Sequence, residues 1–200
     1  MKKFLLLLCA IFTFFCSSNV AAYTFNMGSG SVDISGTDSA LEMYANVNPA
    51  MDDLIFTLSE GVSYSFDFAT IGTNETWIDD DDLISGNLTA FIAFDNPDIG
   101  QACVETSSAV GWTAFEGYAQ GWNVTWNDPV VVDFAVGGQF SIELTDAEYG
   151  SYGSSGPAGT ADVSAIITLI AEPVPEPATI LLVGSGLIGL ARFRRKLKKH

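Results

Sequence analysis

Positive charge is missing from most of the sequence. The eight Lys and Arg residues lie at residues 2–3 and 192–199, whereas the 24 Asp and Glu residues all lie between Asp33 and Glu176. Residues 23–191 therefore carry a formal charge of −24, against −16 for the whole chain. Without Lys or Arg, this segment cannot neutralise phosphates, so we expect no nucleic-acid partner. Such acidity is typical of high solubility and of adaptation to salty water, and it also permits cation binding.

Histidine and cysteine are also scarce. The only histidine is His200, the last residue of the sequence. Its position excludes Ser-His-Asp catalysis, Cys-His catalysis and a His-based zinc site in the rest of the chain. Cys9 and Cys16 lie in an N-terminal apolar run, so Cys103 has no partner for an internal disulfide. We expect Cys103 to be a buried apolar side chain, with an intermolecular disulfide as the alternative. The sequence predicts that the protein is not an enzyme, although 24 acids leave a carboxylate pair for glycoside hydrolysis open.

Helical periodicity is absent between residues 23 and 171. Apolar residues instead recur at every second position, for example in 41–47, 62–68, 88–94 and 140–144. This period of two favours β-strands with one buried and one solvated face. About ten short strands, separated by turn residues, predict an all-β domain. We expect an antiparallel β-sandwich that is jelly-roll-like, with a barrel as the alternative.

Three connections are predicted from local sequence. Residues 54–58 and 62–68 predict a β-hairpin around a turn at 60–61. Two adjacent glycines at 137–138 predict a two-residue hairpin turn. The Gly- and Ser-rich stretch 146–159 predicts a long loop.

A fourth connection, residues 72–86, is polar and contains four consecutive aspartates: Asp79, Asp80, Asp81 and Asp82. Hard cations prefer several oxygen ligands, so one hypothesis is a calcium site in this loop. The acids are not spaced at alternating positions as in a calcium-binding loop, so a solvated acidic loop is the alternative. We expect no other cofactor.

Two tryptophans offer a binding hypothesis. Trp122 and Trp126 lie on the same face of one predicted strand. Exposed, the two rings would stack on sugars; buried, they would belong to the core. A secreted carbohydrate-binding module, using these rings or another exposed aromatic and possibly dependent on calcium, is therefore the alternative function.

The N-terminus carries a sorting pattern. Residues 1–22 combine a basic start, an apolar run and small residues before the junction of Ala22 and Tyr23. This order is typical of a secretory signal peptide that is cleaved at that junction. We therefore expect export by the Sec machinery, removal of the peptide by signal peptidase, and a cargo domain spanning residues 23–171.

The C-terminus carries a second pattern in three parts. Residues 172–179 form a Pro-rich linker that contains Val174, Pro175, Glu176 and Pro177. The apolar residues 180–191 predict a single transmembrane helix, although the run is shorter than the roughly 20 residues usual for crossing a bilayer. Residues 192–200 form a basic tail, which the positive-inside rule places in the cytoplasm. The predicted anchor residues of this tail are Arg192, Arg194, Arg195 and Lys196.

Residues 174–200 resemble the PEP-CTERM sorting signal of Gram-negative bacteria, in both the motif at 174–177 and the order of its three parts. The resemblance implies transient anchoring in the inner membrane and processing at or near the motif by an exosortase. It also implies an association with exopolysaccharide, biofilm and floc matrices. We therefore expect an inner-membrane-anchored precursor that becomes a non-enzymatic component of the cell surface or extracellular matrix, with extracellular polysaccharide as a partner.

Overall fold

The computed structural model describes residues 22–35, 41–114, 119–127, 129–152 and 156–173. Almost all of the predicted signal peptide lies outside these ranges, as do the sorting motif, the predicted transmembrane segment and the basic tail. Within them, the structure contains no helix of the length and apolarity that a membrane span requires.

The described chain is all-β and every strand pair is antiparallel, as the alternating sequence predicts. One short 3₁₀ helix, η1, interrupts the strands. The elements are β1 (Tyr23–Ser35), β2 (Met43–Val47), η1 (Pro49–Asp53), β3 (Ile55–Leu58), β4 (Ser63–Thr73), β5 (Asn87–Asn96), β6 (Gly100–Ala114), β7 (Ala119–Trp126), β8 (Val130–Phe134), β9 (Gly138–Leu144), β10 (Ala147–Tyr152) and β11 (Gly159–Ala171).

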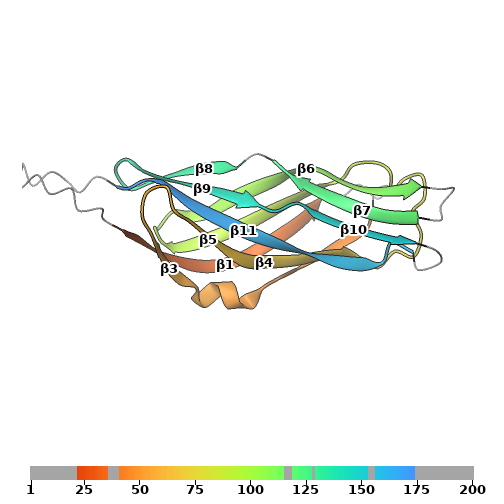
Figure 1. The fold of residues 1–200 in the computed structure, drawn as a ribbon, viewed down its shortest axis with the longest axis horizontal. Coiled ribbons are helices and arrows are strands. Elements are labelled where there is room, and N and C mark those ends of the chain that lie inside the picture. Colours follow the sequence, from red (N-terminus) through yellow and green to blue (C-terminus); the bar gives the residue numbers. More distant parts are fainter. Residues whose placement is uncertain (1–21, 36–40, 115–118, 128, 153–155, 174–200) are drawn as a thin grey trace, which may run out of the picture.

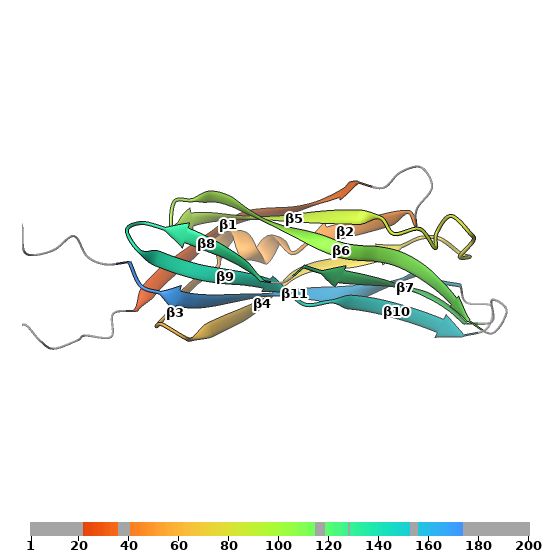
Figure 2. The same ribbon diagram turned by 90° about the horizontal axis from the view of Figure 1, so that it is seen from above.

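Two sheets pack against each other along the length of the domain (Figure 2). One has the strand order β10-β7-β6-β5-β1-β3 and the other the order β2-β4-β11-β9-β8. The start of β1 and the end of β11 lie together at one end of the molecule, here called the terminal end (Figure 1). The opposite end, called the far end, carries the end of β6, the start of β7, the end of β10 and the loop 74–86 (Figures 1 and 2).

Residue alternation explains which face of each strand is buried. In β5, Leu88, Ala90, Ile92 and Phe94 are buried, whereas the residues between them are partly exposed. Each such strand places one row of apolar side chains between the sheets, where removal from water stabilises the fold.

Aromatic rings fill the core at the terminal end. Phe25 of β1 is fully buried, and its ring centroid lies 5.3 Å from that of Phe56 and 5.3 Å from that of Phe140. Phe140 belongs to the other sheet and also contacts Phe94 at 5.0 Å. Because these stacked and edge-to-face pairs cross from one sheet to the other, they hold the two layers together.

The long strand β6 changes partner along its length. Its first half pairs with β5, from Gly100 to Glu105, and its second half pairs with β7, from Thr106 to Ala114. A register shift between Thr106 and Ser108 marks the change. A bulge of this kind bends a strand and increases its twist, so the two halves of β6 serve different ends of the sandwich.

Several sequence predictions are wrong in detail. Residues 54–58 and 62–68 do not form a hairpin: β3 pairs with β1, and β4 pairs with β2 and β11. The Gly/Ser-rich stretch 146–159 is not one loop, because β10 lies within it. The β8–β9 hairpin is confirmed, but the two-residue turn at 137–138 is wrong: Gly138 already pairs with Phe134, so the turn spans residues 135–137, of which Ala135 and Gly137 have positive φ. Jelly-roll-like connectivity is not confirmed, because β5, β6 and β7 are consecutive neighbours in one sheet.

Candidate functional site

The loop 74–86 packs onto the far end of the sandwich through backbone hydrogen bonds. The amide of Ile78 donates to Oε1 of Gln120, at 2.9 Å, inside the core. The amide of Gly111 donates to the carbonyl of Asp82, at 2.9 Å, and so joins the loop to β6. Ile78 is itself buried, with 2% of its surface exposed, so the loop contributes directly to the core.

The four aspartates of this loop differ in exposure. Asp82 is buried, with 4% exposure, and its Oδ2 accepts a hydrogen bond of 2.9 Å from the amide of Asp79. Asp79, Asp80 and Asp81 are exposed to solvent. Within the described ranges, no three Asp, Glu, Cys or His side chains are placed to hold a metal ion together. The calcium site therefore stays a hypothesis: three of the four aspartates face solvent, whereas Asp82 is buried beneath the loop.

Neighbouring carboxyls of this loop shift one another's pKa values. A hydrogen bond between the Asp79 and Asp81 side chains lowers the pKa of Asp79 and raises the pKa of Asp81. Partial burial raises the pKa of Glu75, and the nearby Asp82 carboxylate raises it further. Oε1 of Glu75 also accepts a 2.6 Å hydrogen bond from the amide of Glu42, which opposes that rise. Asp81 and Glu75 therefore keep their protons to a higher pH than isolated carboxyls do, whereas Asp79 loses its proton at a lower pH.

The predicted sugar-stacking residues lie inside the protein. Trp122 has no exposed surface and Trp126 has 6%, and both belong to the main hydrophobic cluster. The prediction that they share one face is confirmed, but this face points between the sheets. Neither ring can stack on an external sugar, so the sugar-stacking hypothesis is wrong for these two residues and the core alternative holds.

Cys103 is also placed differently from the prediction. The thiol is free and exposed on β6, on the outer face of its sheet, rather than buried in the core. Partial burial raises its pKa, and the carboxylate of Glu105 adds to the rise. Because the thiolate is the reactive form, these surroundings disfavour activation of Cys103 as a nucleophile.

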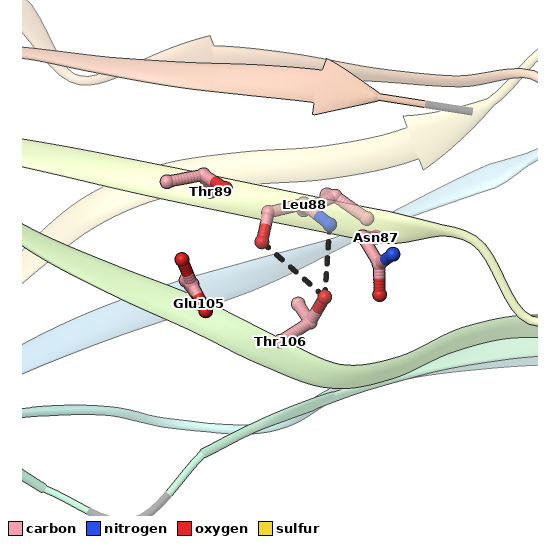
Figure 3. A pocket seen from close by; sticks show the side chains of 5 residues that line it. All are labelled: Asn87, Leu88, Thr89, Glu105 and Thr106. Carbon is pink, nitrogen blue, oxygen red and sulfur yellow. Dashed lines mark hydrogen bonds between the residues drawn. The ribbon is translucent and has the colours of Figure 1, made fainter.

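One surface depression lies where β6 leaves β5 (Figure 3). It has a volume of about 240 Å³ and is lined by Asn87, Leu88, Thr89, Glu105 and Thr106. The hydroxyl of Thr106 accepts a 2.8 Å hydrogen bond from the amide of Leu88 and donates to its carbonyl oxygen at 3.3 Å. The threonine side chain thus connects the two strands at the bulge. Among the described residues that line this depression, Glu105 is the only carboxylate.

A second depression, of about 350 Å³, lies beside η1 and contains Asp67 and Asp162. Oδ1 of Asp162 accepts a 2.9 Å hydrogen bond from the hydroxyl of Thr70. Both carboxylates are exposed to water. Carboxyls that hydrolyse glycosides instead include one shielded in an apolar environment, so this arrangement lacks that feature of a glycosidase site.

Sequence reasoning missed one aromatic side chain. Trp112 of β6 pairs with Gly121 of β7. The neighbouring pair is Gly111 with the buried Trp122, which faces the core, and adjacent pairs point to opposite faces of a sheet. Trp112 is therefore the tryptophan of these strands that lies on the outer face. Only the register between β6 and β7 reveals this, because the two strands carry similar alternating patterns.

The C-terminal region was also compared with known protein families. Residues 173–196 match the PEP-CTERM protein-sorting motif. The chain therefore carries a PEP-CTERM sorting domain, as the sequence resemblance predicts, and this motif implies exosortase-dependent sorting of an exported protein that is membrane-associated before processing. No curated protein and no solved structure matches the chain.

Proposed function

We propose that the protein is a non-enzymatic component of the cell surface or extracellular matrix, released from a membrane-held precursor by an exosortase. The sorting motif at residues 173–196 carries this proposal. Exosortase is the processing partner implied by the motif, and the Sec machinery and signal peptidase are the partners implied by residues 1–22. Extracellular polysaccharide is the proposed partner of the folded domain.

The placement of the chain ends supports a role at a surface. The last described residue, Pro173, follows β11 at the terminal end, where β1 also starts (Figure 1). The motif is therefore joined to one end of a long sandwich, whose opposite end carries exposed Trp77 and Tyr152. A precursor held by its tail would present that far end away from the membrane.

The charge distribution supports release into solution. Processing near Glu176 would remove every Lys and Arg of the exported chain and leave a strongly acidic domain. High net charge favours solubility and opposes non-specific association. We propose no resident cofactor; a rise in melting temperature on adding calcium at fixed ionic strength would instead indicate a bound cation, and loss of that rise on substituting Asp79–Asp82 would place it in this loop.

Substitution of the motif tests the sorting proposal. In a host that contains the processing enzyme, we expect the double variant Pro175→Ala, Glu176→Ala to remain unprocessed in the membrane fraction, while the unaltered protein leaves it. Glu172→Ala is the matched control, because it removes a carboxylate that lies just outside the matched residues. Normal release of the double variant would defeat the proposal.

A further inference from the structure

The indole of Trp112 lies on the outer side of the six-stranded sheet, toward the far end. A Cβ atom added to Gly121 would lie 2.6 Å from Cζ2 of Trp112, and one added to Gly150 would lie 2.8 Å from the same atom. The indole therefore rests against the backbones of β7 and β10, where two glycines leave room for it. Trp112 itself remains half-buried. The structure thus holds a partly exposed aromatic ring on the outer face of this sheet.

Polar and aromatic side chains flank this ring along the same face. Trp112, Gly121 and Gly150 form one row across β6, β7 and β10. Two residues further along β10 lies Tyr152, 70% exposed. On the other side of the Gly121–Gly150 pair, two residues along each strand, Asn123 pairs with Glu148. Because side chains alternate along a strand, these two also lie on the outer face. The face therefore offers two rings beside a hydroxyl, an amide and a carboxylate.

The chemistry of this face selects among possible partners. An acidic polymer or an anionic membrane would be repelled, because residues 23–191 contain no Lys or Arg. A purely aliphatic partner would leave the amide of Asn123 and the carboxylate of Glu148 without hydrogen bonds as it excluded water. A neutral sugar chain meets both requirements: its C–H faces pack on aromatic rings and its hydroxyls donate to and accept from the polar groups.

We propose that the outer face formed by Trp112, Tyr152, Asn123 and Glu148, here called the Trp112 face, binds a neutral polysaccharide chain. The inference rests on the proposed function, since it names the chemistry of the extracellular partner. Trp112 forms the stacking platform and Tyr152 extends it along β10. Asn123 and Glu148 fix the sugar hydroxyls on the other side of the ring.

Native-gel retardation tests the proposal on the exported protein. Gels would contain a soluble neutral β-glucan, a neutral α-glucan or a galactomannan, with alginate, with and without calcium, as the acidic polymer. We expect at least one neutral polymer to retard the protein. Trp112→Ala should weaken this binding about tenfold or more, and Tyr152→Ala about threefold, the size expected for loss of an aromatic contact. Trp77→Ala is the matched control, because Trp77 is 58% exposed but lies outside the Trp112 face, on the loop 74–86.

A covering role for Trp112 predicts different results. Aromatic side chains also stabilise sheets by covering glycines, so Trp112→Ala is expected to lower the melting temperature in either case. Two measurements avoid this problem. The first uses Tyr152→Ala, which removes a ring that is already exposed. The second uses Trp77→Phe, which removes the exposed loop tryptophan and leaves Trp112 as the outward-facing one. The tryptophan fluorescence of this variant should shift when an oligosaccharide from the retarding polymer is added.

The results that support the Trp112 face differ from those that contradict it. Retardation that is weakened by Tyr152→Ala and kept by Trp77→Ala, together with the fluorescence shift, supports the Trp112 face. Three results would overturn it. The first is that no neutral polymer retards the protein, and the second is that only alginate with calcium does. The third is that Trp77→Ala abolishes retardation while Trp112→Ala and Tyr152→Ala leave it unchanged. A protein that is released normally but is not retarded would contradict this inference alone and leave the sorting proposal intact.

Discussion

The two ends of the sandwich are held together by different chemistry. At the terminal end, aromatic rings from both sheets meet in a mostly phenylalanine cluster around Phe25. At the far end, the core includes polar groups, and a loop supplies part of it through Ile78. Four of the five buried polar residues in the described ranges lie toward this end: Thr73, Asp82, Gln120 and Ser151.

This difference separates stability from function. An apolar cluster needs only to exclude water, so the terminal end provides a stable base next to the sorting tail. The far end depends on hydrogen bonds that fix a loop and on glycines that leave room for an outward ring. Such a region is more specific in shape but contains more groups whose loss is costly.

The largest expected effect is loss of the Phe25 ring. Phe25 contacts rings of both sheets and has no exposed surface. We expect Phe25→Ala to lower the free energy of unfolding by about 3–5 kcal/mol, because it removes buried area and leaves a cavity. Urea denaturation measures the change. Phe91→Ala, at a half-buried position on the outer face of β5, is the control, and an equal loss in both variants would contradict the account of the core.

An intermediate effect is expected at the far end. Gln120→Leu keeps the size of the side chain but removes the acceptor for the buried amide of Ile78. We expect a loss of about 1–3 kcal/mol, the cost of leaving a buried donor unsatisfied. Hydrogen exchange should also quicken at Ile78. Gln101→Leu is the exposed control on β6; unchanged exchange at Ile78 would show that the loop is held by other contacts.

The smallest effect concerns Glu75. Its pKa is raised in the folded protein, chiefly by partial burial, so the folded state holds the proton more tightly than the unfolded state. The stability that this proton provides is present at acid pH and is lost as the pH rises through the raised pKa. We therefore expect Glu75→Gln, which keeps the acceptor for the Glu42 amide, to stabilise the protein at neutral pH by less than about 1 kcal/mol.

A pH series of thermal melts checks this sign. The gain from Glu75→Gln should disappear at acid pH, where Glu75 is already protonated in the folded protein. Glu143→Gln, on the exposed outer face of β9, controls for the general benefit of removing one negative charge from an acidic protein. A gain that is equal in both variants at all pH values would show that burial of Glu75 has no role.

The strand content was predictable from the sequence because alternation is a local signal. It placed Trp122 and Trp126 on one face, but it could not tell that this face is buried. Pairing was not predictable, because it depends on distant partners. The turn at 60–61 has the residues of a hairpin, yet it joins the two sheets: β3 belongs to the six-stranded sheet, and the amide of Gly61 donates to the carbonyl of Leu169 in the five-stranded one.

The candidate site shows the same limit. Gly150 belongs to a Gly- and Ser-rich stretch that predicts a loop, but it lies in a strand whose outer face is covered by Trp112. That contact joins β6 to β10 and follows only from the three-dimensional register. The sorting motif, in contrast, is recognised by a linear order of residues, so the sequence alone identified it.

The mass of the intact protein recovered outside the cell tests the central claim most directly. The account predicts a chain that starts at Tyr23 and ends at or near Pro175-Glu176-Pro177, without the basic residues 192–199 and without His200. A mass that includes the sequence through His200 would contradict processing by an exosortase.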